Sequence, residues 1–116
     1  MIGNLKIFQF SNSIHDDGTF CFSDNQGSGM RKVSLLSLEK MILDLLESDP
    51  KILTFSNKDF HSTILFDKRK ISTILPPNNR EEEFLSLEEL EARVDEMVEK
   101  FVLSSFGSYL CIILEN

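Results

Sequence analysis

Short runs of hydrophobic residues alternate with polar, turn-forming segments over most of the chain. Each run is four to six residues long and rich in Ile, Leu, Phe and Thr, which is typical of β-strands. The pair Asp17-Gly18 is a strong turn signal, so the first two runs are expected to form a hairpin. Five strands are therefore predicted, at residues 5–10, 19–22, 52–55, 62–66 and 71–75.

A first helix is predicted at residues 37–46, where hydrophobic residues recur at helical spacing. Either Ser37 or Ser34, one turn earlier, can cap its start. Asp49-Pro50 ends it, because the residue before a proline avoids the helical region.

A second, longer helix is predicted at residues 87–106, with one apolar stripe and one acidic face. Ser86 and Glu89 form a capping box at its start, and Gly107 is expected to end it. The apolar residues 109–114 either return as a last strand or pack as a short helix.

These elements predict a single α+β domain over residues 1–116, with the order β-β-α-β-β-β-α and a five-stranded antiparallel sheet. The runs at 52–55 and 62–66 are nearly continuous in apolar residues, a pattern typical of strands buried on both faces. We therefore expect helices to cover both faces of the sheet.

The chain also resembles itself. Residues 6–12 resemble residues 51–57, and residues 36–39 match residues 85–88, at offsets of 45 and 49. A duplicated β-β-α unit would give this pattern, and chance recurrence of similar strands and caps explains it equally well.

Charge narrows the class of partner. The chain has a net charge of -7, with 19 acidic against 12 basic residues, and its basic residues cluster only at 31–32 and 68–70. Nucleic acids and anionic lipids both attract clustered cations, so neither is an expected partner. Nine of the acids lie between residues 81 and 99. They form either a solvated helix face or a surface that recognises a basic partner.

The remaining composition indicates a cytoplasmic protein. Cys21 and Cys111 stand in apolar stretches and are expected to be buried free thiols. The N-terminal residues lack the pattern of a signal peptide, and no apolar run is long enough to span a bilayer.

Motifs for catalysis or metal binding are incomplete. The loop at residues 24–29 partly resembles a calcium loop, but Leu35 stands where a bidentate glutamate is needed. Its Gly-Ser-Gly segment lacks the other residues of a phosphate-binding loop. His15 and His61 lie in predicted turns and would form a zinc site only if those turns met. No catalytic, cofactor-binding or metal-binding residue is predicted, and an enzyme is not expected.

The order of elements resembles the longin, or SNARE-like, fold over about residues 5–106. In this resemblance the helices are residues 37–46 and 87–106, and the strands are residues 6–10, 19–22, 52–55, 62–66 and 71–75. It implies a sheet whose first strand is central and whose second and third strands lie at opposite edges.

The resemblance also implies a function. Longin-like domains are mostly non-catalytic adaptors or regulators that act with small GTPases or pair with a like domain, so a homodimer is one expectation. Their pairing surface commonly uses the first helix and a neighbouring edge strand. In this chain those positions are Lys40, Asp44, Glu47, Leu53 and Phe55.

An alternative function belongs to another class. A small acidic protein can act as an inhibitor, such as a toxin-immunity protein or a phage-encoded blocker, by covering a basic site. The residues expected to do so are Glu91, Asp95 and Glu99 on the second helix.

Overall fold

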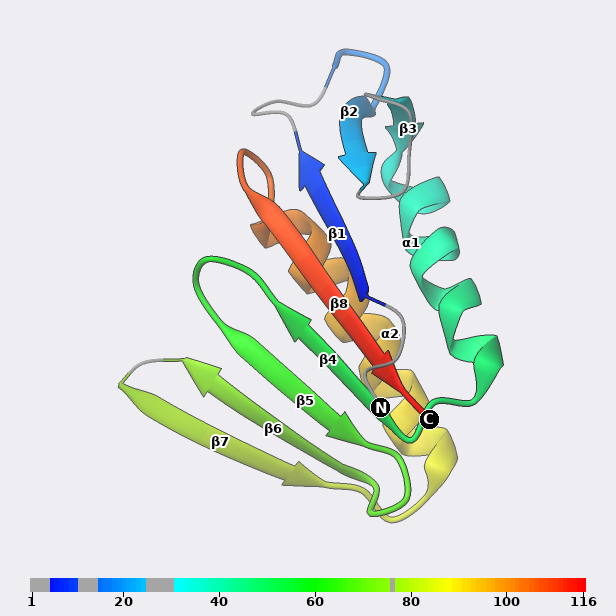
Figure 1. Cartoon of the computed structure of the whole chain (residues 1–116), viewed down its shortest axis with the longest axis vertical. Coiled ribbons are helices and arrows are strands. Elements are labelled where there is room, and N and C mark those ends of the chain that lie inside the picture. Colours follow the sequence, from blue (N-terminus) through cyan, green and yellow to red (C-terminus); the bar gives the residue numbers. More distant parts are fainter. Residues whose placement is uncertain (1–4, 11–14, 25–30, 76) are drawn as a thin grey trace.

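The described part of the chain folds into one antiparallel sheet with two α-helices (Figure 1). The computed structural model describes residues 5–10, 15–24, 31–75 and 77–116. Within them the strands are β1 (Leu5–Phe10), β2 (Thr19–Asp24), β3 (Arg31–Ser34), β4 (Ile52–Ser56), β5 (His61–Leu65), β6 (Lys70–Leu75), β7 (Asn78–Glu83) and β8 (Tyr109–Glu115). The helices are α1 (Leu35–Asp44), followed by the 3₁₀ turn η1 (Leu45–Ser48), and α2 (Leu87–Ser104).

The predicted α+β class, the antiparallel sheet and the two helices are confirmed, and the sheet contains all five predicted strands. It is wider than predicted, because β3, β7 and β8 join it. The apolar C-terminal run is therefore a strand. β3 and β7 are polar strands at the two edges of the sheet. Their backbones pair with β2 and β6, but their sequences lack the run of apolar residues from which a strand is predicted.

The strand order is β3-β2-β1-β8-β4-β5-β6-β7. The C-terminal strand β8 lies between β1 and β4 and pairs antiparallel with both. The longin resemblance implies that the second and third predicted strands, β2 and β4, lie at opposite edges. Here β2 lies inside β3, and β4 lies between β8 and β5.

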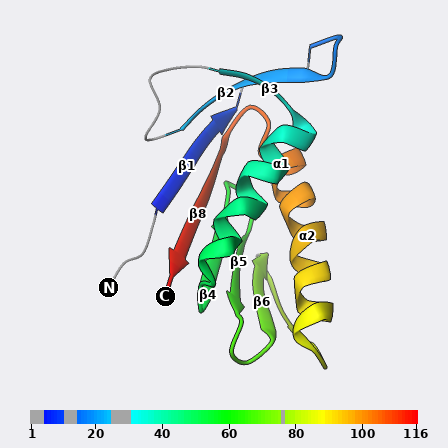
Figure 2. The same ribbon diagram turned by 90° about the vertical axis from the view of Figure 1, so that its right-hand side faces the viewer.

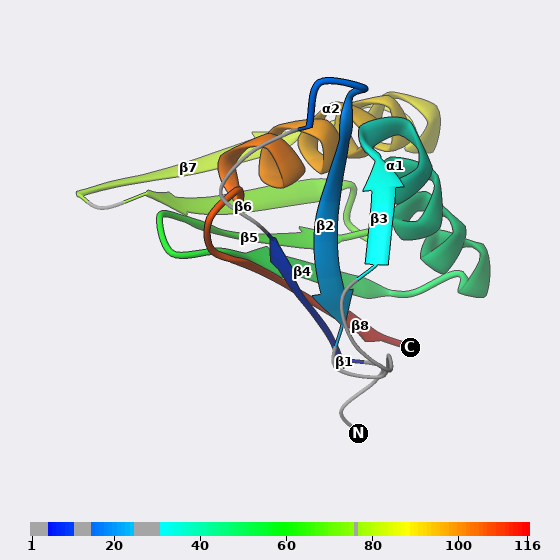
Figure 3. The ribbon, with the colours of Figure 1, turned by 90° about the horizontal axis from the view of Figure 1, so that it is seen from above.

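Both helices lie on the same face of the sheet (Figures 2 and 3), so the prediction that helices cover both faces is wrong. Burial alternates along β4 and β8, as expected when one face is covered. The apolar run in β4 misled because its outward residue Ile52 is still half-buried beside its cross-strand neighbour Leu65. A strand whose outer face is only partly buried can therefore have a continuous apolar run, even though no helix covers that face.

The hydrophobic core lies between the helices and the inner face of the sheet. Among the described residues it contains 18 buried hydrophobic side chains, six of them from α2. Phenylalanine rings gather at two places. Phe20 meets Phe106 edge-on at 4.8 Å between ring centroids, and Phe101 lies 4.4 Å from Phe60. These contacts fix the C-terminal half of α2 against the sheet.

Serine side chains cap both helices. The Ser34 hydroxyl accepts a hydrogen bond from Ser37 N–H at 3.1 Å, so Ser34 is the cap of α1. The Ser86 hydroxyl accepts from Glu89 N–H at 3.2 Å, as the capping box predicted. Ser37 therefore lies inside its helix and Ser86 outside, which weakens the proposed duplication.

The helix ends follow the predicted signals. Asp49 ends η1 in the left-handed conformation at φ 50°, directly before the proline. Beyond α2, Gly107 has φ 76° and turns the chain into β8. α2 ends two residues earlier than predicted, at Ser104.

Asn57 joins the β4–β5 turn to the end of α2. Its side-chain amide donates to the hydroxyls of Ser104 at 2.9 Å and Ser105 at 3.2 Å. Its carbonyl oxygen accepts from the backbone N–H groups of Asp59 and Phe60, at 2.9 and 3.1 Å. Asn57 is 6% exposed, and without it the N–H groups of Asp59 and Phe60 would lose their acceptor, whereas the two serine hydroxyls still donate to the Phe101 carbonyl.

We expect Asn57→Ala to lower the free energy of unfolding by roughly 2–3 kcal/mol, the usual cost of leaving buried polar groups unpaired. Asn79→Ala, at an exposed position of β7, is the control and should change it by less than about 0.5 kcal/mol. Urea unfolding measures both. A similar small effect for the two variants would show that the Asn57 contacts do not hold α2.

We expect Arg69→Gly to raise the free energy of unfolding by up to about 1 kcal/mol. Arg69 has φ 51° in the β5–β6 turn, where its N–H donates to Phe66 at 3.2 Å, and glycine adopts this conformation without strain. Lys68→Gly, at the preceding position, should instead lower stability. Thermal unfolding would contradict this account if both glycines acted in the same direction.

Candidate functional site

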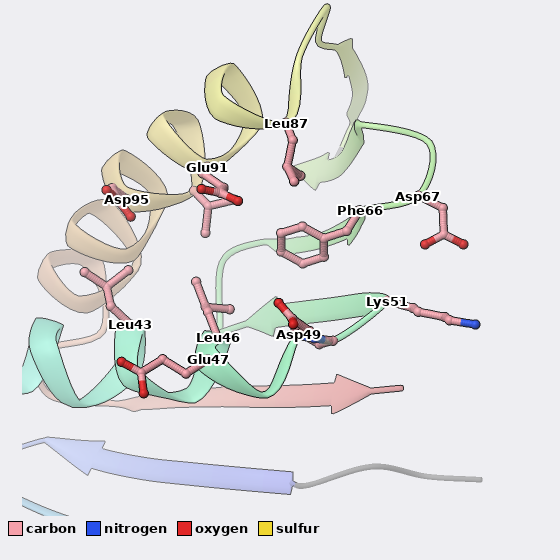
Figure 4. A pocket seen from close by; sticks show the side chains of 12 residues that line it. Leu43, Leu46, Glu47, Asp49, Lys51, Phe66, Asp67, Leu87, Glu91 and Asp95 are labelled. Atoms are coloured by element: carbon pink, nitrogen blue, oxygen red, sulfur yellow. The ribbon is translucent and has the colours of Figure 1, made fainter.

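A groove of about 530 Å³ opens between the two helices at one end of the molecule (Figure 4). Its volume falls within the range of ligand-binding sites in proteins. The end of α1, η1, the connection from η1 to β4, the β5–β6 turn and the first half of α2 enclose it. It is lined by Leu43, Leu46, Glu47, Asp49, Pro50, Lys51, Phe66, Asp67, Leu87, Glu91, Val94 and Asp95.

The floor of the groove is apolar. Leu43 and Leu46 reach into it from α1 and η1, Phe66 from the β5–β6 turn and Leu87 from the start of α2. Val94 of α2 also lines the groove and is fully buried. Leu87 is 48% exposed, so this floor presents apolar surface to solvent.

The rim of the groove is acidic. It carries five carboxylates and one ammonium group, a formal charge of 1 − 5 = −4, from Glu47, Asp49, Asp67, Glu91, Asp95 and Lys51. Within the described residues none of these five carboxylates has an ion-pair partner. All five are exposed, so they can interact with a positively charged partner.

The groove brings together residues from both functional predictions. Glu47 belongs to the predicted pairing surface, and Glu91 and Asp95 belong to the predicted acidic surface. Lys40 and Asp44 do not line the groove; they form an exposed ion pair at 3.5 Å along α1. Both therefore stay on the solvent side of that helix.

Glu99, the third residue of the predicted acidic surface, is exposed on α2 and lies outside the groove. The acidic run at residues 81–83 is also separate from α2, because it forms part of the edge strand β7.

Leu53 and Phe55 do not lie at a surface. They are 1% and 0% exposed on the inner face of β4, so they cannot take part in the predicted pairing. β4 was expected to be an edge strand. It is an interior strand because β8 pairs with the edge that was expected to be free.

Several groove residues were missed from the sequence. From the sequence, Asp49 is predicted only to end a helix, and Lys51, Phe66 and Asp67 are assigned to no site. No spacing along the chain links these positions. Their shared signal is that each acid stands at an element boundary beside an apolar residue.

Glu39 adds unfavourable charge between the helices. One of its carboxylate oxygens is buried and has no hydrogen-bond partner in the described part of the chain. Burial, and secondly the negative charge of Glu99, raise the pKa of Glu39 above its ordinary value of 4.5. The folded protein therefore binds this proton more tightly than the unfolded chain does, and the ionised carboxylate costs stability at neutral pH.

We expect Glu39→Gln to raise the free energy of unfolding at neutral pH. The gain should shrink as the pH falls toward 4.5, where the wild-type carboxyl also becomes neutral. Urea unfolding across this pH range measures it, with the exposed Glu83→Gln on β7 as control. A difference that does not vary with pH would exclude ionisation of Glu39 as the cause.

The histidines do not meet. His15 precedes β2 and His61 begins β5, and β1, β8 and β4 lie between these strands. His15 Nε2 instead lies 3.6 Å from Cys21 Sγ. Both cysteines are free and half-buried rather than fully buried as predicted, and neither lines the groove.

Asp17 lies beside this histidine. The hydroxyl and the N–H of Thr19 both donate to its carboxylate, and Lys32 Nζ is 3.2 Å away. These contacts, with the Thr19 hydroxyl first, lower the pKa of Asp17 to about 2. They stabilise the β1–β2 turn and point to no ligand.

No group of three or more His, Cys, Asp or Glu side chains is placed to hold a metal ion in the residues that the structure describes. The weak calcium and phosphate signals fall on residues 24–29, of which residues 25–29 lie outside those that the structure describes. Neither described helix combines the length and apolar character needed to cross a membrane.

Comparison with protein-family models, with curated proteins and with solved structures finds no match to this chain. The groove is therefore the feature of this chain that indicates a function.

Proposed function

We propose that this chain is a non-catalytic protein-interaction module whose groove binds a basic, apolar segment of a partner protein. The observation that carries the proposal is the set of five unpaired carboxylates around an exposed apolar floor. Apolar contacts supply most of the affinity of such interfaces, and complementary charge supplies orientation and fast association.

An amphipathic helix suits this groove. Helix-in-groove recognition uses apolar anchors at helical spacing and charged residues beside them. Leucine anchors would cover Leu46, Phe66 and Leu87, and lysine or arginine side chains would reach Glu91 and Asp95. A second copy presents the same negative rim, so like-charge repulsion disfavours a homodimer built groove to groove.

Two partner classes suggested by the sequence fit an adaptor or regulator. One is a small GTPase, and the other is a chain of the longin-like type. Either would have to present a basic segment with apolar anchors to this groove. The strand order does not have the arrangement that the longin resemblance implies, so the groove and not the fold supports this proposal.

The inhibitor alternative uses the same surface. Glu91 and Asp95 lie on adjacent turns of α2 and could cover the basic active site of an enzyme. An inhibitor abolishes the activity of its partner at one-to-one stoichiometry, whereas an adaptor leaves its partner active. An activity assay of the complex therefore separates the two.

A designed peptide tests the groove directly. We expect a short amphipathic helix of leucine and lysine to shift the backbone amide signals of groove residues in an NMR titration. Glu91→Lys/Asp95→Lys should weaken binding about tenfold or more, since two attractive charge pairs become repulsive. Glu81→Lys/Glu83→Lys on β7 changes the net charge equally and should leave the affinity unchanged within about twofold.

Two results would contradict the proposal. One is equal weakening by both double variants, which would mean that only net charge matters. The other is equal binding of a matched leucine–glutamate peptide. It would mean that the groove carboxylates do not favour a basic peptide over an acidic one.

A further inference from the structure

A second cavity, of about 350 Å³, lies between α2 and the strands β5, β6 and β7. It shares no lining residue with the groove. It is lined by Asp59, Phe60, Ser62, Thr73, Leu75, Asn78, Arg80, Glu82, Arg93, Met97, Lys100 and Phe101. A volume at the small end of the range for ligand sites favours a small molecule.

The cavity exists because the side chains of the sheet beneath α2 are small at this point. Ser62 and Thr73 are cross-strand neighbours on β5 and β6, and their hydroxyls are hydrogen bonded at 2.9 Å. Elsewhere on the inner face, the corresponding pair Ile64 and Ile71 is apolar and fully buried. The Ser62–Thr73 pair therefore forms a satisfied floor without filling the space under α2.

The walls of the cavity are apolar. Phe60 and Phe101 stand together on one side, with their ring centroids 4.4 Å apart, and Met97 lies on the same helix as Phe101. Leu75 is 51% exposed and offers further apolar surface. Met97 and Phe101 are 4% and 1% exposed and form the base of the cavity, so Phe60 and Leu75 offer the accessible apolar surface that suits an aliphatic body.

The charges around the cavity favour an anion. Three cations and two carboxylates line it, giving 3 − 2 = +1 in a chain whose net charge is -7. Arg93 lies 3.5 Å from both Glu82 and Glu96. Within the described residues Arg80 and Lys100 make no ion pair, and Asp59 is the one unpaired carboxylate of the lining. One carboxylate can therefore pair with Arg80 and Lys100 without displacing an existing ion pair.

We propose that this cavity binds a small amphipathic carboxylate, of the class of medium-chain fatty acids. Its aliphatic chain packs against Phe60 and Leu75, above the buried Met97 and Phe101. Its carboxylate is held by Arg80 and Lys100 at the rim. The site is separate from the groove, so the two can be occupied together.

Decanoate, below its micelle concentration, is the probe. In an NMR titration we expect saturable amide shifts at Phe60, Thr73 and Phe101. Arg80→Gln/Lys100→Gln should weaken binding about tenfold or more, and the neutral decanol should bind the wild type correspondingly weakly. Lys68→Gln/Arg69→Gln, in the β5–β6 turn, removes the same charge outside the cavity and should bind decanoate as the wild type does.

The proposal is overturned if decanoate gives no saturable shift at these amides. It is also overturned if decanol binds as tightly as decanoate, or if the two double variants weaken binding equally. The groove variant Glu91→Lys/Asp95→Lys should retain decanoate binding, so failure of the groove proposal and failure of this one remain distinguishable.

Discussion

The packing of both helices against one face of the sheet determines the rest of this structure. α2 supplies six of the 18 buried hydrophobic side chains, and α1 adds Leu38 and Ile42. Both helices lie on one face of the sheet. The space between and beside them is filled where large side chains meet, and it stays open elsewhere. The groove lies where α1 ends and α2 begins, and the second cavity lies beside the other half of α2. Both candidate sites are consequences of this one-sided core.

The central position of β8 supports that core. β8 pairs with β1 on one side and β4 on the other, so the last strand joins the N-terminal hairpin to the β4–β7 meander. Its inward residues Leu110, Ile112 and Leu114 are buried under the helices. Asn57 adds a polar link between the β4–β5 turn and the end of α2. The strands and helices around the groove are therefore fixed in place by neighbouring elements on both sides.

Local signals in the sequence predicted the two helices and five of the strands. The remaining strands and the strand order depend on pairing between distant segments, which local signals do not encode. Ser86 was recognisable as a cap, and Ser34 as one of two candidates with Ser37, because a cap bonds within its own turn. β7 was missed because its residues are charged, and its pairing with β6 is not encoded in hydrophobicity. Phe55 was misplaced at a surface because the sequence does not show which face of β4 the helices cover, and its ring packs 5.2 Å from Phe101 of α2. Glu47, Glu91 and Asp95 were each predicted, but only the fold shows that they share one groove.

Photo-crosslinking tests the central claim, that the groove is the binding surface, most directly. Leu87 lines the groove and Leu103 lies outside it on the same helix, and they are similarly exposed, at 48% and 46%. A photoreactive residue placed at each position, in extracts of the cells from which the sequence comes, samples the two surfaces equally. We expect a discrete crosslinked partner protein from position 87 and none from position 103. The same crosslinks from both positions, or crosslinks from position 103 alone, would contradict the account.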